Sequence, residues 1–257
     1  MLTLIAESKT MLDEQHLVTQ EDLKYHSPVT EEQAALIMRR LGQLSQPDLI
    51  AQTGLSPSLA AKLRQSIYEF PNKALGIKAI AAYTGVVFKA LDYDSLDAQA
   101  KQECRQNVRI ISSLYGFLRP DDIIKPYRLD FITKAAPDAK PLNTFWKSTV
   151  TIQLVKTIRE QGHREVLDLL PSDASKCIDW KIVKKFCKVW KVDFAEITEG
   201  EKIKTPAATK LKTARGKLLR QILCDRINDI TALKNLKSDD FFYEGTPVYP
   251  DHLRFLC

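Results

Sequence analysis

Apolar residues recur along the chain at spacings that alternate between strand and helix. Residues 1–9 form a short apolar run interrupted at Glu7, which predicts a first buried strand. Residues 30–33 (Thr-Glu-Glu-Gln) have the form of a capping box, in which Thr is followed three residues later by Gln. This predicts the start of an amphipathic helix that ends near Ser45.

Residues 47–67 hold two short pieces with helical spacing. Gly54 separates them, and the Ser-Pro-Ser sequence at residues 56–58 is a typical helix start. The pattern predicts a helix-hairpin-helix element within the domain.

Three central segments also follow regular patterns. Residues 95–118 show the longest uninterrupted helical spacing, with Pro120 just beyond it, and predict a central helix. A second helix is expected from about residue 144 to residue 161, before Gly162. The apolar residues 166–170 then predict a short buried strand.

The C-terminal part combines a predicted β-hairpin with a predicted helix. Residues 188–197 are rich in strand formers, and residues 199–201 (Glu-Gly-Glu) can turn the chain back into a partner strand. Residues 207–230 carry apolar side chains on one side and basic ones elsewhere. Because no repeat or linker divides the chain, residues 1–257 are expected to form one mixed α/β domain, a central β-sheet surrounded by helices.

The composition excludes several classes of protein. The chain is 44% hydrophobic and 27% charged, which is typical of globular domains. No run approaches the roughly 20 apolar residues of a membrane-spanning helix, and the N-terminus lacks the pattern of a signal peptide. Five cysteines without a Cys-x-x-Cys pair favour a reducing cytoplasm. No metal-ligand spacing or nucleotide-binding glycine motif occurs, so we expect neither a metal nor another cofactor.

Positive charge is concentrated in the C-terminal half. Residues 140–257 hold 22 Lys or Arg against 15 Asp or Glu, whereas residues 1–139 hold 16 against 17. Residues 176–220 alone hold 13 basic against 5 acidic side chains. This block favours a polyanionic partner, but a solvated surface neutralised by acids from elsewhere in the fold explains it equally well.

Short segments spread over most of the chain carry a resemblance to a known family. The central ones are residues 113–120 (Ser-Leu-Tyr-Gly-Phe-Leu-Arg-Pro) and 126–129 (Pro-Tyr-Arg-Leu). The others are Ser8-Lys9-Thr10, Tyr83-Thr84-Gly85, Phe145-Trp146, Ser172-Asp173, Ala214-Arg215-Gly216 and Phe241-Phe242. In sequence, spacing and order they resemble the YaaA family of peroxide-stress proteins.

The resemblance implies a bacterial cytoplasmic protein of the oxidative stress response, similar to relatives that bind DNA through a helix-hairpin-helix. It implies no settled reaction. Two departures from the family pattern adjoin Lys9 and Asp173 in the sequence: Glu7-Ser8 stands where Pro-Ala or Cys-Ala is usual, and Ala174 follows Asp173 where Glu-Tyr is usual. A third is Thr213, which replaces a lysine.

The predicted hairpin is the first candidate DNA contact, because backbone N–H groups at a helix N-terminus can face a phosphate. Gly54 and Leu55 would form the turn. Ser56 and Ser58 would cap the second helix and contact phosphate, and Lys62 lies one turn further on. The second turn glycine of the stricter motif is missing, so a purely structural helix pair is the alternative.

Two arginines flank a proline-containing loop after the central block. Arg119 and Arg128 could form a fork around a phosphate. Internal pairing is the alternative, and the acids available for it are Asp121, Asp122 and Asp130.

The predicted C-terminal helix adds Lys210, Lys212 and Arg215. Together with the hairpin and the arginine loop, these side chains would form a basic groove for double-stranded or distorted DNA.

Lys9 and Asp173 are the catalytic candidates. Lys9 follows an apolar strand, where loops often form sites, and a partly buried lysine there would have a depressed pKa and act as a nucleophile. With Asp173 as the acid, it would suit a lyase that attacks an abasic sugar through a Schiff base. A salt-bridged lysine is the alternative, and the sequence establishes no enzymatic activity.

The aromatic residues admit two roles. Tyr83, Tyr115 and Tyr127 could stack on bases in a groove, although core packing is favoured for Tyr115. Trp146 and Trp190 are expected to be packing anchors.

Three functional hypotheses follow. The first is a monomeric DNA-binding protein of the peroxide stress response that protects or processes damaged DNA. The second is an enzyme acting on a nucleotide or other small phosphorylated substrate, with Lys9, Arg119, Arg128 and Arg215 gathered around one phosphate. The third is an interaction protein whose basic face meets an acidic partner.

Overall fold

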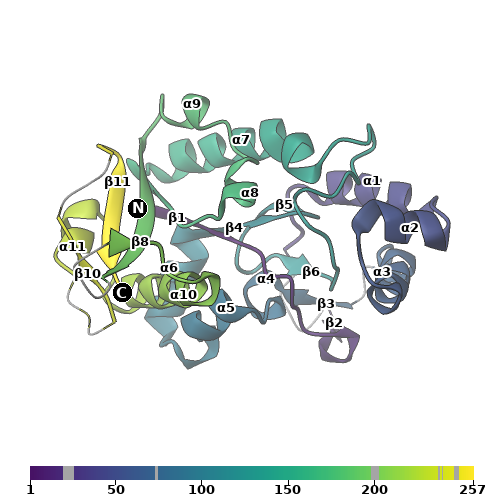
Figure 1. Cartoon of the computed structure of the whole chain (residues 1–257), viewed down its shortest axis with the longest axis horizontal. Helices are drawn as coiled ribbons and strands as arrows, with labels where there is room; N and C mark the ends of the chain where they lie inside the picture. Colours follow the sequence, from purple (N-terminus) through teal and green to yellow (C-terminus); the bar gives the residue numbers. More distant parts are fainter. Residues whose placement is uncertain (20–25, 73–74, 198–202, 237, 239, 246–248) are drawn as a thin grey trace.

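A central sheet organises the computed structural model, which describes residues 1–19, 26–72, 75–197, 203–236, 238, 240–245 and 249–257. The sheet has eight strands in the described part of the chain and is flanked by helices (Figure 1). In pairing order the strands are β10 (Phe242–Tyr243), β11 (His252–Leu256), β8 (Lys188–Ile197), β7 (Glu165–Asp168), β1 (Leu2–Ala6), β4 (Val108–Ser112) and β5 (Gly116–Leu118), with β9 (Ile203–Lys204) paired to β8. The predicted mixed α/β fold class is confirmed.

Strand β1 lies at the middle of the parallel part of the sheet. It pairs in parallel with β4 on one side, where Ile5 is opposite Ile110, and with β7 on the other, where Thr3 is opposite Leu167. All five residues of β1 are buried, as expected for a parallel strand covered on both faces. Because later strands add on both sides of β1, its carboxyl end is a switch point of the topology, where ligands of open α/β sheets bind.

Helices cover both faces of this sheet. Helix α7 (Leu142–Gln161) runs along one side with α9 (Trp180–Val183), and α5 (Val86–Leu91), α6 (Ala98–Asn107) and α10 (Ala208–Cys224) lie on the other (Figure 1). Gly216 allows α10 to approach α5, because an added Cβ would lie 2.2 Å from the backbone oxygen of Val87. The described chain also contains the short helices α4 (Ala79–Ala82), α8 (Ser172–Ser175) and α11 (Ile230–Lys234), and α4 contacts β3 and β6.

A smaller group of elements lies at one end of the molecule (Figure 1). It contains the helices α1 (Glu31–Gly42), α2 (Gln46–Thr53) and α3 (Pro57–Glu69), together with the three-stranded sheet β2 (Val18–Thr19), β3 (Leu75–Lys78) and β6 (Ile123–Ile124). Gly54 ends α2 with a φ of 66°, in the left-handed region that glycine adopts without strain. Ser56 then caps α3 by accepting a hydrogen bond from the backbone N–H of Leu59.

The prediction of one long helix over residues 95–118 is wrong. Only residues 98–107 are helical, and β4 and β5 follow within the predicted range. Val108, Ile110 and Ile111 are fully buried in β4, where they pair with β1. A short apolar run fits a buried strand as well as a buried helix, and here a partner strand more than one hundred residues away in sequence decides between them.

The capping box expected at residues 30–33 is also wrong. Thr30 precedes α1, but its hydroxyl donates to the backbone oxygen of Tyr115 instead of capping the helix. Most of the other expected elements are confirmed: the strand within residues 1–9, the helix near 144–161, the strand near 166–170 and the antiparallel pair of β8 and β9. The predicted turn at residues 199–201 lies outside the described residues, and the last long helix ends at Cys224 instead of residue 230.

Candidate functional site

The carboxyl ends of β1 and β7 open into a hollow of about 420 Å³, called here the central hollow. Both catalytic candidates, Lys9 and Asp173, line it, and α10 contributes Lys212. The other lining residues come from segments 6–10, 85–88 and 130–132 and from Pro171. Its position at the switch point of the sheet is the position that the topology favours for a ligand.

Lys9 lies at the surface of this hollow. Its side chain is 64% exposed, and its Nζ atom lies 2.7 Å from Oδ1 of Asp130. The expectation of a partly buried lysine is therefore wrong, and the salt-bridged alternative is confirmed. Asp173 forms its own ion pair with Lys176, at 3.0 Å between Oδ1 and Nζ, so the two catalytic candidates share the hollow without pairing with each other.

Glu7 lines the central hollow and has a strongly raised pKa. Its carboxylate accepts hydrogen bonds from the backbone N–H of Ser113, at 2.8 Å, and from the hydroxyl of Tyr127. The Tyr127 hydroxyl also contacts the hydroxyls of Tyr83, at 2.8 Å, and Ser112, at 2.7 Å. Burial raises the pKa of Glu7 to about 7, although the hydrogen bonds from Ser113, Tyr127 and Ser112 oppose the rise.

Sequence reasoning does not single out Glu7 as a functional residue. A signal exists, because Glu7 is an acid placed directly after a buried central strand. A carboxyl with a pKa near 7 can exchange a proton at neutral pH, which is the property required of a general acid or base.

A second hollow, called here the hairpin hollow, adjoins the first. Its volume is about 460 Å³, and Lys9, Lys62 and Arg128 line it together with residues of α3. Lys9 and Thr10 line both hollows. Three basic side chains from distant parts of the sequence therefore meet at one surface.

The turn of the predicted hairpin does not line this hollow. Leu55 is buried, whereas Ser56 and Ser58 are exposed and their hydroxyls lie 3.2 Å apart. The helix pair around Gly54 is present, and its role as a DNA-binding motif stays a prediction.

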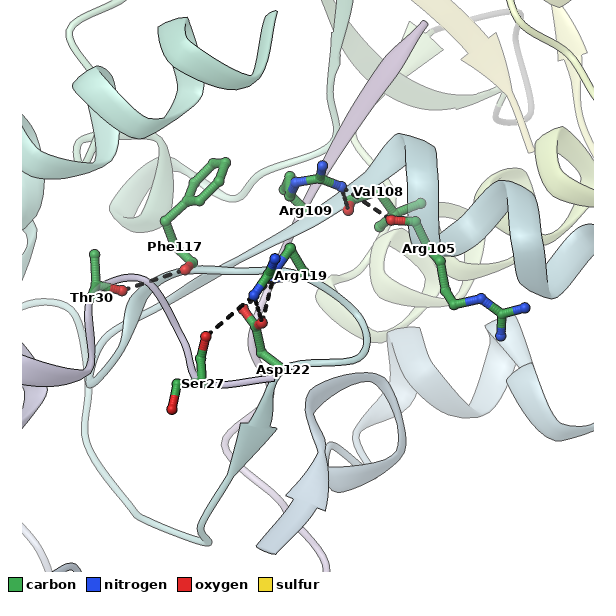
Figure 2. Close-up of polar contacts among 8 residues, drawn as sticks. All are labelled: Ser27, Thr30, Arg105, Val108, Arg109, Phe117, Arg119 and Asp122. Carbon is green, nitrogen blue, oxygen red and sulfur yellow. Dashed lines mark hydrogen bonds and ion pairs between the residues drawn. The ribbon is translucent and has the colours of Figure 1, made fainter. Parts of the chain in front are cut away.

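Arg119 lines neither hollow, and its guanidinium points to Asp122 and Ser27 (Figure 2). Its Nε donates to Oδ1 of Asp122 at 2.9 Å, and its Nη2 donates to the backbone oxygen of Ser27 at 3.2 Å. The side chain of Asp122 is only 1% exposed, and burial raises its pKa to about 6, against the opposing effect of Arg119. Internal pairing therefore holds Arg119, and the fork of Arg119 with Arg128 around one phosphate is not formed.

The three basic candidates of α10 point to different places. Lys212 lines the central hollow. Lys210 forms an ion pair with Glu196, at 2.8 Å between Nζ and Oε2. Arg215 lines a third hollow, on β8 and β11. The gathering of Lys9, Arg119, Arg128 and Arg215 around one phosphate is therefore wrong, because only Lys9 and Arg128 meet.

The three tyrosines for which the sequence leaves base stacking and core packing both open belong to the core. Tyr83, Tyr115 and Tyr127 are 2%, 3% and 7% exposed, so base stacking is wrong for Tyr83 and Tyr127, and core packing is confirmed for Tyr115. Trp146 and Trp190 are buried as predicted.

The fold and the hollows define a mixed α/β protein with a crevice at the carboxyl edge of its central sheet, where the half-buried carboxyl of Glu7 adjoins the exposed cations Lys9 and Lys212. Among the described residues, no group of His, Cys, Asp and Glu is placed to hold a metal ion, and no helix has the length and apolarity to cross a membrane.

Comparison with known proteins gives the family. A family model described as "Peroxide stress protein YaaA" matches residues 1–246, and the chain belongs to this family. A UPF0246 protein of Parabacteroides distasonis is 30% identical over 259 residues, covering 100% of this chain and 99% of the relative. Those of Alteromonas mediterranea and Francisella tularensis subsp. novicida are 30% and 29% identical, with coverages of 95% and 92% of this chain and 93% and 92% of the relatives.

Proposed function

We propose that this peroxide stress protein is a monomeric, cytoplasmic DNA-binding protein that protects or processes damaged DNA. The convergence of Lys9, Lys62 and Arg128 on the hairpin hollow is the observation that carries the proposal. Lys212, in the adjoining central hollow, extends the row of cations. DNA phosphates are recognised by such rows of lysine and arginine side chains without regard to base sequence.

The charges of the hairpin hollow suit a phosphate backbone. Lys62 is exposed and has no ion-pair partner within the described part of the chain. Asp13 is the acid of this lining, and it pairs with His16 at 2.7 Å between Oδ1 and Nδ1. Two of the three cations, Lys62 and Arg128, are thus available for phosphate, while Lys9 is shared with Asp130.

The test is a fluorescence-anisotropy titration of labelled duplex, bubble and abasic-site DNA at two salt concentrations. Lys62→Glu should weaken binding to all three and reduce the salt dependence. Lys156→Glu is the matched control, because Lys156 is an exposed lysine of α7 that lines neither the central nor the hairpin hollow. No binding of the unmodified protein at low salt, or equal loss in both variants, would remove the proposal.

The central hollow supports a second candidate, an enzyme acting on a nucleotide or other small phosphorylated substrate. Glu7 would exchange the proton, and Lys9 and Lys212 would bind the anionic group. A lyase reaction through a Schiff base between Lys9 and an abasic sugar would first require Lys9 to separate from Asp130 and lose its proton. Borohydride reduction with abasic DNA distinguishes the lyase from the enzyme that acts on a small phosphorylated substrate. A trapped adduct that Lys9→Arg abolishes supports the lyase. Turnover of a phosphorylated small molecule without a trapped adduct supports the other enzyme.

A further inference from the structure

A third hollow of about 440 Å³ lies against β8 and β11 and shares no residue with the central or hairpin hollows. It is called here the Arg215 hollow. Four cations and one acid line it among the described residues, with two hydroxyl groups beside them. The residues that matter here are Lys191, Lys204, Arg215, Arg254, Asp193 and Ser172.

The register of the sheet builds this polar lining. Lys191 of β8 is opposite His252 of β11 and also opposite Asp168 of β7, while Asp193 is opposite Arg254. Residues directly opposite each other, and residues two apart on one strand, lie on the same face of a sheet. One face of β8 and β11 therefore carries a patch of charged side chains.

Most of these charges are already paired. Lys204 lies 3.2 Å from Glu196, Arg254 lies 3.1 Å from Glu244, and Asp193 lies 2.5 Å from Nδ1 of His252. Asp193, the acid of the lining, is thus paired with His252 and forms no ion pair with Lys191 or Arg215.

Arg215 and Lys191 are the exceptions among the described residues. The side chain of Arg215 is half-buried, its Nε is fully buried, and the guanidinium has no hydrogen bond or ion pair to any described residue. Burial lowers the pKa of Arg215, and the more distant Asp168 and Asp193 oppose that effect. Lys191 likewise has no ion pair in the described part of the chain, and its side chain is exposed at the same hollow. The part of the Arg215 side chain that lines the hollow can therefore donate its N–H groups to an anionic ligand there.

We infer that the Arg215 hollow binds the dianionic phosphate group of a phosphate monoester, with Arg215 as the principal ligand and Lys191 as the second. A guanidinium presents its N–H donors in a planar fork that matches two phosphate oxygens. Two unpaired cations balance the two charges of a monoester, and the hydroxyls of Ser172 and Thr205 in the lining supply further donors. The site does not depend on DNA binding in the hairpin hollow.

A dianionic phosphate group occurs both at the phosphorylated 5′ end of a DNA strand and on small phosphorylated molecules. Isothermal titration calorimetry with inorganic phosphate, in a phosphate-free and sulfate-free buffer, tests the shared chemistry first. A deoxynucleoside 5′-monophosphate and short duplexes with and without a 5′-phosphate then separate the sources. Preference for the 5′-phosphorylated duplex, lost in Arg215→Gln, assigns the site to DNA ends, and binding of the monophosphate without that preference assigns it to a small molecule.

The variants make the test specific to this hollow. Arg215→Gln should weaken phosphate binding by at least about tenfold, Lys191→Gln by a few-fold, and Arg215→Lys should retain part of the affinity. Lys217→Gln is the matched control, because Lys217 lies on the same helix, pairs with Asp240 and lines none of the three hollows. Lys191 is exposed, so its variant tests the site even where loss of Arg215 disturbs the fold.

Absence of phosphate binding, or phosphate binding that Arg215→Gln and Lys191→Gln leave unchanged, would overturn the inference. Because inorganic phosphate is the probe, loss of DNA binding in Lys62→Glu does not affect this result. The two proposals can therefore fail separately.

Discussion

The guanidinium of Arg128 donates a hydrogen bond to the backbone oxygen of Lys9, with 3.1 Å between Nη1 and O. This contact joins residues 119 positions apart in the sequence and places two cations at the edge shared by the central and hairpin hollows. Arg119, at the other end of the same loop, is instead committed to buried Asp122 (Figure 2). The two arginines of the loop therefore have separable roles.

Replacing Arg128 by Gln should weaken DNA binding while leaving the free energy of unfolding nearly unchanged. Loss of one phosphate contact is expected to reduce the slope of log affinity against log salt by about 0.9. Anisotropy titrations at several salt concentrations measure this slope. An unchanged slope would show that Arg128 does not contact a phosphate.

Replacing Arg119 by Gln should have the opposite outcome. The buried carboxylate of Asp122 would lose its charged partner, and we expect a fall of about 2 kcal/mol in the free energy of unfolding. DNA affinity at fixed salt should stay the same, since Arg119 lines neither hollow. Urea denaturation of Arg119→Gln and Arg128→Gln side by side compares the two, and a stability loss confined to Arg128→Gln would contradict the assignment.

Gly54 should tolerate Asn much better than Val. Its φ of 66° lies in the left-handed region, which costs a β-branched residue on the order of 1–2 kcal/mol. No atom would crowd an added Cβ there, so backbone strain is the main effect. Thermal unfolding of Gly54→Val and Gly54→Asn measures the difference, and equal stability of the two variants would count against a strained turn.

Glu7 should make the protein less stable as the pH rises from about 4.5 to about 7. Its folded-state pKa of about 7 lies above its ordinary value of 4.5, so in this range the folded state binds more protons than the unfolded state. The stabilisation is fully present below pH 4.5 and is lost as the pH rises through about 7, and the free energy of unfolding falls by about 3 kcal/mol.

Glu7→Gln isolates this effect, because Asp122 and Asp168, whose pKa values are also raised, titrate in both proteins. Denaturation midpoints at pH 5 and pH 8 should therefore differ less in Glu7→Gln than in the unmodified protein. The same pH dependence in both proteins would mean that Glu7 is already ionised at pH 5.

The helices and strands that have a clear pattern in the contiguous sequence could be predicted. The N-terminal strand, the helix near residues 144–161 and the helix pair around Gly54 all have such signals: an apolar run, a helical period with a closing glycine, and a glycine followed by a serine cap. The resemblance to the peroxide-stress family likewise rests on contiguous segments, and the family model confirms it.

Other features depend on partners that the sequence does not name. The residues of β4 are typical of a strand but also fit the helical spacing around them. Pairing with β1 decides in favour of the strand. Thr30 binds the backbone of Tyr115 instead of capping a helix, because the fold brings an acceptor to it.

The sequence by itself determined the class of fold, the family and the supply of basic side chains. Only the tertiary structure decided which of those side chains meet. Lys9, Lys62 and Arg128 converge, Arg119 is neutralised by Asp122, and Arg215 faces a hollow of its own. The physical reason is that a cation's role depends on the nearest acids and on its burial, and both are set by strand register and helix packing between residues far apart in the chain.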